Sequence, residues 1–287
     1  MDLSIIMINY NMPKLTEQAV TSILSCHPAL AFEIIVVDNS EDPAHRYSDH
    51  RPGVKVLDGV ENRGFGNACN IGALHTVGTD LLFLNSDTLM HPGTLERCVD
   101  YLSVHPQVGA LGVRTLLRDG ALDHACKRGF PTPFASFCYF TGLDRIFPLN
   151  RRLGAYRATY LDETDVGEVD SVAGSFLMMP RHVFEKIGGF DETFFMYGED
   201  LDLCFRVRQL GYGVVYNGQA TIVHLKGQSG LHTKSKTVVF HFYNAMKLFY
   251  QKHYRRKYPA VLNAAVYCAI GLKYRISLAK IRWGRGV

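Results

Sequence analysis

Short apolar runs alternate with segments of helical spacing along the first 105 residues. Runs rich in Ile, Val and Leu predict strands at residues 3–10, 32–40, 54–58 and 80–88. The segments around them predict helices at residues 13–27, 64–78 and 92–105. Nearly continuous apolar strands that alternate with helices are typical of a parallel sheet covered on both faces. The pattern therefore predicts an α/β fold.

Three of these predicted strands end in polar residues. Their ends read Asn9-Tyr10-Asn11, Asp38-Asn39-Ser40 and Asn85-Ser86-Asp87. In parallel α/β sheets, ligands bind outside the carboxyl ends of the strands. We therefore expect these polar side chains to gather on one rim of the sheet and to contribute to a binding site.

The pattern is less regular in the second half of the chain. Residues 115–168 contain Pro131, Pro133 and Pro148 and predict loops and short helices. Beyond them we expect a strand at 168–180 that includes Gly174, a helix at 181–188, a helix from about 199 to 210, two further strands, and a polar loop after His224.

Composition adds limits to this picture. The chain has 287 residues, of which 47% are hydrophobic and 20% charged, so we expect a packed core in one large domain or in one domain with an appendage. Its seven cysteines are scattered without a CxxC pair, which argues against a disulfide framework or a zinc cluster and for a reducing compartment. The start, MDLSIIMINYN, reads as a first strand and not as a signal peptide.

The net charge of +4 conceals two oppositely charged parts. Residues 226–287 contain 13 Lys or Arg and no Asp or Glu, whereas residues 1–225 contain 18 basic and 27 acidic residues. A basic, aromatic-rich tail on an acidic body indicates a surface that meets polyanions. Nucleic acid and anionic lipid are the two obvious candidates.

The basic tail contains two apolar segments. The first, residues 236–258, has an apolar helical face that predicts core packing, and its members are Val239, Phe242, Tyr243, Met246, Phe249 and Tyr250. The second, residues 259–272, is shorter than the ~20 residues that span a bilayer. Basic flanks and Trp283 favour an interfacial helix at residues 255–287 on an anionic membrane, with a helical appendage or an oligomer contact as the alternative. We expect no binding of nucleic acid.

Asp87 is the first candidate for chemistry. A carboxylate at a strand end is often a helix cap or a turn former. Beside Asp38 and the segment 62–70 on the same rim, Asp87 also suits a hard oxygen ligand that holds Mg²⁺ or Mn²⁺ against phosphates.

The segment ENRGFGNACNIG, residues 61–72, is not a dinucleotide-binding fingerprint, because Cys69 stands at the third glycine position. The chain also lacks a GxxxxGK stretch, so no P-loop is expected. Either the small residues of this segment allow close helix packing, or Asn62, Asn67 and Asn70 hydrogen-bond a nucleotide or sugar. Arg63 is suited to a diphosphate.

The segment YGEDLDLCFR, residues 197–206, places three acids within four positions. Acids in a first helical turn complement the helix dipole, and Asp202 and Arg206 form an ordinary i,i+4 pair. Those roles need only one or two acids, so Glu199 and Asp200 are also candidates for a general base. His224, at the end of a predicted strand, is either structural or a contact to metal or phosphate.

Taken in order, these stretches resemble the inverting family-2 glycosyltransferases of the GT-A fold over residues 3–229. The chain is most similar to the bacterial cell-surface rhamnosyltransferases within that family. The stretches that match are INYN, VVDNSED, ENRGFGNACNIG, FLNSDT, AGSFLMMPRHVFEKIGGFDETFFMYGEDLDLCFRVRQLGY and HLKGQS. The resemblance implies a mixed, mainly parallel central sheet flanked by helices, with a C-terminal helical extension.

The resemblance also implies a division of the chain. Residues 1–230 would form the catalytic domain, with a nucleotide-sugar half at about 1–114 and an acceptor half at about 115–230. Residues 231–287 would form a basic amphipathic helical region.

Roles for individual residues follow from the same resemblance. Asp200 of the Glu199-Asp200 pair is the catalytic base, and Asp87 and His224 bind Mg²⁺ or Mn²⁺. The family usually has Asp-x-Asp at the strand end, and Asn85 replaces the first Asp, so Asp87 alone carries over as an anionic ligand. The residues predicted to bind the nucleotide sugar are Asn11, Asp38, Asn62, Arg63, Gly64, Asn67, Asn70, Asn85 and Ser86.

The implied reaction is a single displacement at the anomeric carbon. A base takes the proton of the acceptor hydroxyl while a metal stabilises the charge on the leaving diphosphate. The predicted donor is dTDP-L-rhamnose, followed by a UDP-sugar, and the predicted acceptor is a lipid-linked saccharide of a surface polysaccharide. The enzyme is expected in the cytoplasm, peripheral on the inner face of the cytoplasmic membrane.

Two other functions fit parts of the sequence. A sugar nucleotidyltransferase shares the sheet type but needs a glycine-rich basic loop after the first strand, which NYNMPKLTEQ does not provide. A non-catalytic scaffold would bind nucleotide or membrane. The presence of both Glu199 and Asp200 argues against a scaffold.

Overall fold

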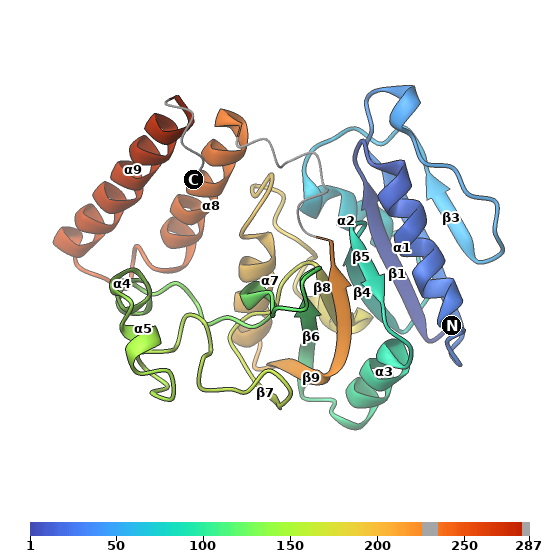
Figure 1. Ribbon diagram of the computed structural model, residues 1–287, viewed down its shortest axis with the longest axis horizontal. Helices are drawn as coiled ribbons and strands as arrows, with labels where there is room; N and C mark the ends of the chain where they lie inside the picture. The colour runs from blue at the N-terminus through green and yellow to red at the C-terminus, as the bar shows by residue number, and fades with distance from the viewer. Residues whose placement is uncertain (226–234, 283–287) are drawn as a thin grey trace.

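A computed structural model describes residues 1–225 and 235–282 (Figure 1). The polar loop predicted after His224 and the predicted anchor Trp283 lie outside the described residues. The strands are β1 (Leu3–Asn9), β2 (Phe32–Asp38), β3 (Val54–Leu57), β4 (Asp80–Asn85), β5 (Thr88–Met90), β6 (Val108–Leu116), β7 (Val166–Glu168), β8 (Phe176–Pro180) and β9 (Gly213–His224). The α-helices are α1 (Pro13–Ser25), α2 (Phe65–Ala73), α3 (Thr94–Val104), α4 (Pro133–Thr141), α5 (Leu143–Ile146), α6 (Arg181–Lys186), α7 (Glu199–Gln209), α8 (Lys236–His253) and α9 (Ala260–Arg282).

The described strands form one mixed sheet in the order β3-β2-β1-β4-β8-β6-β9-β5, with β7 paired to β9. The pairs β1–β2, β1–β4, β2–β3 and β6–β9 are parallel, whereas β8 runs antiparallel to β4 and β6. Helices flank this sheet, and two helices follow it at the C-terminal end (Figure 1). The predicted fold class is therefore confirmed.

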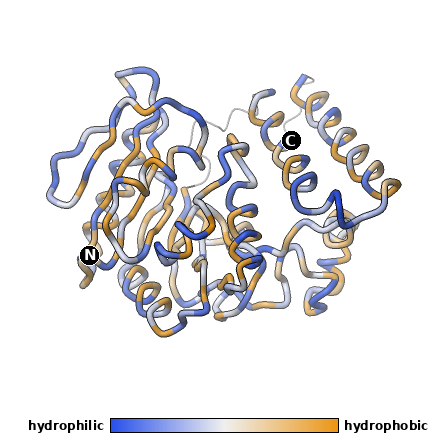
Figure 2. Tube along the Cα trace, turned by 180° about the vertical axis from the view of Figure 1, so that it is seen from behind, coloured by the Kyte–Doolittle hydropathy of each residue, from blue (hydrophilic) through white to orange (hydrophobic). Residues whose placement is uncertain are grey.

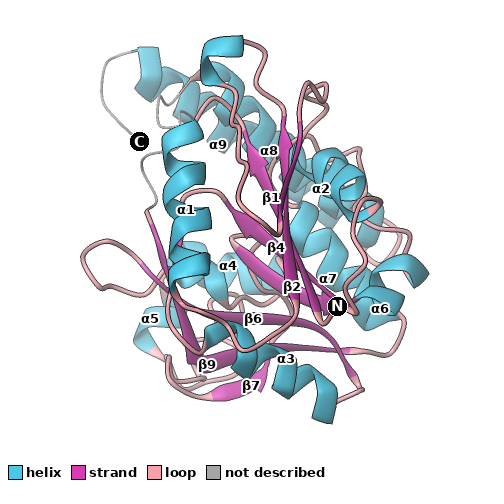
Figure 3. Ribbon diagram, turned by 90° about the vertical axis from the view of Figure 1, so that its right-hand side faces the viewer, coloured by secondary structure: helices cyan, strands magenta, loops and turns pink. Residues whose placement is uncertain are grey.

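Helices cover both faces of the sheet, as the nearly continuous apolar strands predict (Figure 3). Successive residues of a strand point to opposite faces. Leu82 of β4 accordingly packs in a cluster with Ile23 of α1 and Leu95 of α3. The next residue, Phe83, packs in a separate cluster with Phe184 of α6 and other residues of α2 and α7.

The C-terminal helices α8 and α9 lie side by side as a hairpin beside the part of the chain that holds the sheet (Figure 1). Hydrophobic residues occur along both helices as well as on the central strands (Figure 2). Phe249 and Tyr250 are buried in a cluster with Phe205 of α7, as the apolar face of 236–258 predicts, whereas Phe242 is 47% exposed. In the described parts of the chain, no helix has the length and apolar character needed to cross a membrane.

A buried network of charges fixes this hairpin on α7. The carboxylate of Asp202 is fully buried and accepts a hydrogen bond from Arg206 Nε at 2.7 Å. Its other oxygen lies 2.7 Å from Lys252 Nζ and 2.7 Å from His253 Nε2, both on α8. Because Asp202 lies in the first turn of α7, this network ties the hairpin to the segment that carries Glu199 and Asp200.

Three element predictions need correction. The segment after α7 forms one 12-residue strand, β9, and not two strands. Its pairing with β6 skips from Asn217 to Thr221, so the Asn217-Gly218 dipeptide lies in an irregularity within the strand and not in a turn. Gly174 precedes β8, and the helix predicted at 64–78 ends at Ala73.

Candidate active site

The carboxyl ends of β1 and β2 are joined by a buried hydrogen-bond network around Asp38. Asn9 Nδ2 donates to Asp38 Oδ2 at 2.8 Å and to Ser40 Oγ at 3.0 Å. The backbone amides of Ser40 and Tyr47 donate to the two oxygens of Asp38 at 2.8 and 2.5 Å. Asp38 is fully buried and fixes the loop that follows β2. Its predicted contact with a nucleobase stays a prediction.

Asn11 lies on the same rim in the left-handed region, with φ 57°. Its backbone amide donates to Ser40 Oγ at 2.9 Å, and the residue is exposed to solvent. The structure therefore brings the ends of β1 and β2 together, as the parallel pairing of these strands predicts.

The turn before α2 needs glycine at position 64. Gly64 has φ +103°, and an added Cβ would lie 2.4 Å from the carbonyl oxygen of Phe195. Asn62 Oδ1 accepts a hydrogen bond from the Gly64 amide at 3.2 Å, which holds the turn. The loop before α2 therefore packs directly on the loop that leads to α7. Arg63 belongs to the loop before α2 and is exposed to solvent.

Asn67 and Asn70 strengthen this contact from α2. Their side-chain amides donate to the carboxylate oxygens of Glu192 at 2.9 Å each. Asn70 also accepts a hydrogen bond from the Phe190 amide at 2.8 Å and donates to the Phe190 carbonyl at 3.0 Å. These contacts support the close-packing interpretation of the segment. Direct contacts of both asparagines to a nucleotide remain predicted.

Pairing of β5 with β9 brings Asp87 and His224 together, although they are far apart in the sequence. Thr88 is opposite His224 in the antiparallel ladder, and the Leu225 amide donates to the Asp87 carbonyl at 2.7 Å. His224 Nε2 lies 3.0 Å from Asp87 Oδ1, and Nδ1 lies 3.3 Å from Asp123 Oδ2. Burial alone would lower the pKa of His224, but its hydrogen bonds to Asp123 and Asp87 outweigh burial and raise the pKa to about 9.

This pair fits a hard divalent cation as part of a larger ligand set. In the described residues, no group of three or more His, Cys, Asp or Glu side chains is arranged to hold a metal. Mg²⁺ and similar ions in phosphate-transfer sites commonly take one or two protein ligands and complete their shell with waters and substrate phosphates. Asp123 behind the imidazole matches the carboxylates that orient metal-binding histidines. Asp87 and His224 therefore suit a metal that is shared with a bound diphosphate.

Asp200 lies in the first turn of α7 and is held by three donors. Arg128 Nη2 donates to Asp200 Oδ2 at 2.6 Å, and the Gly174 amide donates to the same oxygen at 3.1 Å. The Leu201 amide donates to Oδ1 at 2.7 Å. The side chains of Arg128 and Asp200 are 17% and 12% exposed, so the ion pair is mostly shielded from water. These three donors hold the Asp200 carboxylate in one orientation.

Glu199 lies beside Asp200 in the first turn of α7 and has a raised pKa. Burial, followed by the adjacent charge of Asp200, raises the pKa of Glu199 to about 8. Its Oε2 atom is buried without a hydrogen-bond partner. Two adjacent carboxyls with different environments are typical of sites that move protons. Burial and the neighbouring charge of Asp200 therefore both favour the protonated form of Glu199.

Backbone hydrogen bonds link the strand-end acids to Asp200. The Asn85 amide donates to the Ser175 carbonyl at 3.2 Å, beside the end of β4. The neighbouring Gly174 amide donates to Asp200. The turn that carries Ser86 and Asp87 and the start of α7 are thus both anchored on residues 174–175. The structure therefore places the two acidic motifs around one short segment.

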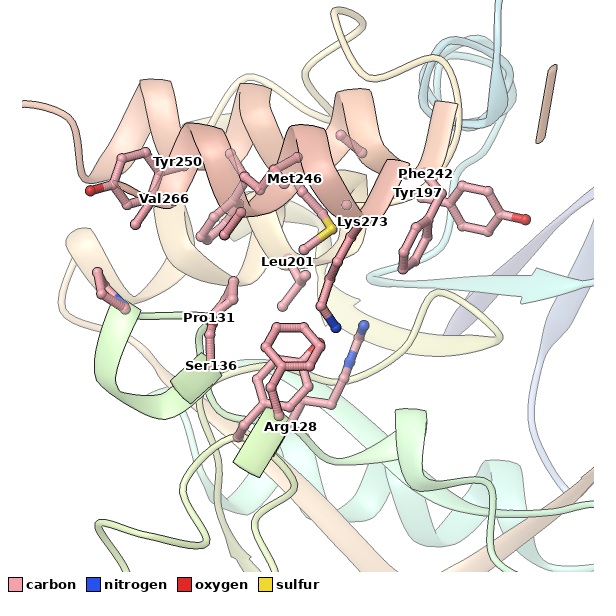
Figure 4. A pocket seen from close by; sticks show the side chains of 18 of the residues that line it. Arg128, Pro131, Ser136, Tyr197, Leu201, Phe242, Met246, Tyr250, Val266 and Lys273 are labelled. Atoms are coloured by element: carbon pink, nitrogen blue, oxygen red, sulfur yellow. The ribbon is translucent and has the colours of Figure 1, made fainter. Parts of the chain in front are cut away.

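A cavity of about 500 Å³ opens beside this pair of acids (Figure 4). Glu199 and Asp200 lie in its wall, together with Arg128 and Tyr156 from the irregular middle of the chain. Most of the remaining wall comes from α4, α8 and α9, and the loop before α7 adds Tyr197 and Gly198. A substrate with an apolar part can therefore approach Asp200 from the side of the C-terminal hairpin.

Sequence reasoning missed Arg128 and Asp123 as parts of the site. Both lie in the irregular segment 115–168, whose residues carry no periodic signal. Arg128 reaches Asp200 because an isolated bridge pairs its backbone with Ser171. Asp123 reaches His224 because residues 117–123 double back on the end of β6, with the Asp123 amide donating to the Thr115 carbonyl. The contacts of both residues depend on tertiary structure alone.

Comparison with known proteins relates this chain to a family of enzymes. The model of glycosyl transferase family 2 matches residues 4–188, and the model of the N-terminal domain of galactosyltransferase matches residues 166–226. An N-acetylglucosaminyl-diphospho-decaprenol L-rhamnosyltransferase of Mycobacterium tuberculosis is 31% identical over 209 residues, which cover 68% of this chain and 67% of that protein. The rhamnosyltransferase WbbL of Escherichia coli is 27% identical over 231 residues, covering 77% of this chain and 83% of WbbL.

Solved structures agree on the fold. The mannosyltransferase PcManGT of Pyrobaculum calidifontis, in complex with GDP-Man and Mn²⁺, superposes with a TM-score of 0.56 at 19% identity, covering 98% of this chain and 72% of that one. GalNAc-T7 with UDP, GalNAc and Mn²⁺ gives a TM-score of 0.57 at 16% identity over 80% of this chain and 44% of its own. These likenesses confirm the predicted GT-A fold. With a family model that matches residues 4–188, the chain belongs to glycosyl transferase family 2.

Proposed function

We propose that this chain is a metal-dependent inverting glycosyltransferase that moves L-rhamnose from dTDP-L-rhamnose to a lipid-linked saccharide in cell-surface polysaccharide synthesis. A UDP-sugar is the alternative donor. One observation carries the proposal: Asn85, two residues before the Asp87 that pairs with His224, is hydrogen-bonded to Ser175, and the adjacent Gly174 amide donates to Asp200. Two of the relatives are rhamnosyltransferases, which supports rhamnose as the sugar.

Asp200 is the general base of this proposed reaction. Its carboxylate is fixed by Arg128 and by two backbone amides, and it borders the cavity beside α7. It takes the proton of the acceptor hydroxyl while the oxygen of that hydroxyl forms a bond to the anomeric carbon. The bond from that carbon to the diphosphate oxygen breaks on the opposite face, and its electron pair leaves with the nucleoside diphosphate.

The other half of the site serves the leaving diphosphate. When bound, Mg²⁺ or Mn²⁺ supplies positive charge that offsets the charge developing on the diphosphate. Asp87 and His224 would hold that ion, with Asp123 keeping the imidazole in place. The exposed Arg63 beside Gly64 is suited to the same phosphates, because its guanidinium can bind phosphate oxygens in pairs.

The proposal includes a division of labour along the chain. Residues 1–114 would bind the nucleotide sugar, residues 115–230 the acceptor, and residues 231–287 would form the basic helical region. The exposed apolar residues of this last region support peripheral attachment to the inner face of the cytoplasmic membrane through residues 255–287. Val261 is 83% exposed, and Leu272 is 61% exposed.

Consumption of sugar nucleotides tests the proposal. The full chain is incubated with dTDP-L-rhamnose, UDP-glucose, UDP-N-acetylglucosamine or GDP-mannose, and release of the nucleoside diphosphate is followed by chromatography. We expect release from dTDP-L-rhamnose with Mn²⁺, its loss after chelation, and its recovery when Mn²⁺ is added back.

Release from a UDP-sugar instead would select the alternative donor. Binding of a donor in calorimetry without any release, with and without Mn²⁺ and a saccharide acceptor, would support the non-catalytic scaffold and contradict the proposed enzyme.

A further inference from the structure

The cavity beside Glu199 and Asp200 has two chemically different ends. Arg128 and Lys273 supply positive charge beside the two acids, whereas the helices α4, α8 and α9 supply an apolar wall. Its volume of about 500 Å³ falls within the range of about 300–1,000 Å³ that is usual for small-molecule sites. A charged end joined to an apolar wall suits an amphiphile with an anionic head.

Lys273 is the main evidence for an anion at the charged end. Its ammonium lies 3.2 Å from the ring centre of Phe140, and no carboxylate lies within ion-pair distance of it among residues 1–225 and 235–282. Figure 4 shows the nitrogen of Lys273 and the guanidinium of Arg128 pointing into the cavity toward one another. Asp200 already balances the charge of Arg128, so Lys273 is the cation of this end that has no carboxylate partner among the described residues.

The second cation also has unused donors. Arg128 binds Asp200 through Nη2, while its Nε is buried without a hydrogen-bond partner. Lys273 is partly buried, and burial lowers its pKa. A phosphate-type ligand could supply a counter-charge for Lys273 and an acceptor for Arg128, because its oxygens accept hydrogen bonds from ammonium and guanidinium groups.

The apolar wall continues from this charged end to the surface. Ala269 lies one helical turn before Lys273 on α9 and lines the same cavity, opposite Met246 and Phe249 of α8. Phe137 and Phe140 of α4 and Phe242 of α8 also line the cavity and are 57%, 50% and 47% exposed. Exposed aromatic residues gathered around one opening mark an apolar binding surface.

From these features we propose that the cavity binds a prenyl diphosphate, the lipid part of the acceptor. Lys273 and Arg128 face the diphosphate, and the walls of α4, α8 and α9 hold the first isoprene units. A sugar attached to that diphosphate would then present its hydroxyl beside Asp200. This inference rests on the proposed function, and it adds the position and chemistry of the lipid site.

A prenyl diphosphate suits the shape of the cavity better than a phospholipid does. A phospholipid carries two acyl chains, whereas a prenyl diphosphate carries one chain, and one cavity of about 500 Å³ joins the apolar wall to Lys273. Short-chain phosphatidylglycerol therefore serves as the competitor that separates the two sources of phosphate.

Calorimetric titration of the full chain with farnesyl diphosphate tests the inference. We expect saturable binding that is at least tenfold tighter than that of farnesol, which lacks the head, and of inorganic pyrophosphate, which lacks the chain. Equal affinity for farnesol or for pyrophosphate would overturn the proposal. So would displacement of farnesyl diphosphate by equimolar short-chain phosphatidylglycerol.

Substitutions then test each end of the cavity. Lys273→Met should weaken binding of farnesyl diphosphate at least tenfold, and Lys273→Arg should keep it within threefold of the wild type. Lys247→Met is the matched control, because Lys247 is an exposed lysine of α8 outside the cavity. The affinity of this variant for farnesyl diphosphate should equal that of the wild type. Ala269→Phe should weaken farnesyl diphosphate while leaving pyrophosphate unchanged. Wild-type affinity in both Lys273→Met and Ala269→Phe would refute this lipid site.

Failures of the two proposals give different results. Wild-type protein that consumes a sugar nucleotide but shows no preference for farnesyl diphosphate contradicts the lipid site alone. Wild-type protein that binds farnesyl diphosphate as expected but consumes no sugar nucleotide contradicts the proposed enzyme alone.

Discussion

Replacement of Arg128 by methionine should move the pH dependence of the reaction. Arg128 Nη2 lies 2.6 Å from Asp200 Oδ2, and its charge also counteracts the elevated pKa of Glu199. Methionine keeps part of the side-chain volume and removes the charge. Glu199 should then hold its proton to higher pH, and the Asp200 carboxylate loses the cation that faces it.

The size of the shift follows from the geometry. Two unit charges about 4 Å apart interact by about 4 kcal/mol at an effective dielectric constant of about 20. That energy corresponds to about three pKa units, which is an upper limit because the partly exposed pair is screened by water. The acidic limb of the pH–rate profile should therefore move up by about 1–3 units.

The assay is donor consumption between pH 5 and 10, with Arg128→Lys as the charge-preserving control. Arg128→Lys should keep the limb within about half a unit of the wild type, since an ammonium still faces the acids. An unchanged limb in Arg128→Met, at reduced or normal rate, would refute the assignment of Arg128 as the group that tunes Glu199 and Asp200.

Two further predictions concern stability. Burial opposes ionisation of Asp202, but its contacts with His253, Lys252 and Arg206 lower its pKa. The stability that these contacts give to the fold is therefore present above about pH 4 and is lost as the pH falls through the lowered pKa. Asp202→Ala should lose about 3–5 kcal/mol in urea unfolding at pH 7 and less at pH 3, because it leaves buried cations unpaired; an equal loss at both pH values would contradict this reasoning. Gly64→Ala should lose at least about 1–3 kcal/mol, because the left-handed backbone and the contact with Phe195 both oppose a Cβ. Unfolding of this variant at the wild-type urea concentration would show that the turn can rearrange.

The first half of the fold could be predicted from the sequence because its strands are buried on both faces. Apolar runs such as Leu3–Asn9 and Phe32–Asp38 cannot be solvent-exposed strands, and their polar ends mark the rim of a parallel sheet. Prediction failed at β9, where Asn217-Gly218 has the composition of a turn. The strand continues because neighbouring segments pair with it on both sides.

The candidate site was predictable only in part. Asp87, Glu199, Asp200 and His224 stand at element ends, where local patterns mark them as candidates. Arg128 has no such mark, since its bond to Asp200 depends on contacts across 72 residues.

The basic tail shows the same limit. The sequence marks Lys273 only as part of the charge flanking an apolar run. Its direction into the cavity is set by the packing of α9 against α8, which no local pattern encodes. Local patterns therefore found the groups that carry chemistry, and tertiary packing decided which of them meet.

Transfer by the Asp200→Asn variant is the most direct test of the account. Asparagine keeps the size of the side chain but cannot take a proton, and general bases contribute about 10²–10⁴-fold to such reactions. We predict a loss of kcat in that range, with the affinity for the donor unchanged and the melting temperature lowered, because Arg128 loses its ion pair. A variant that transfers sugar within tenfold of the wild-type rate would contradict the assignment of Asp200 as the base.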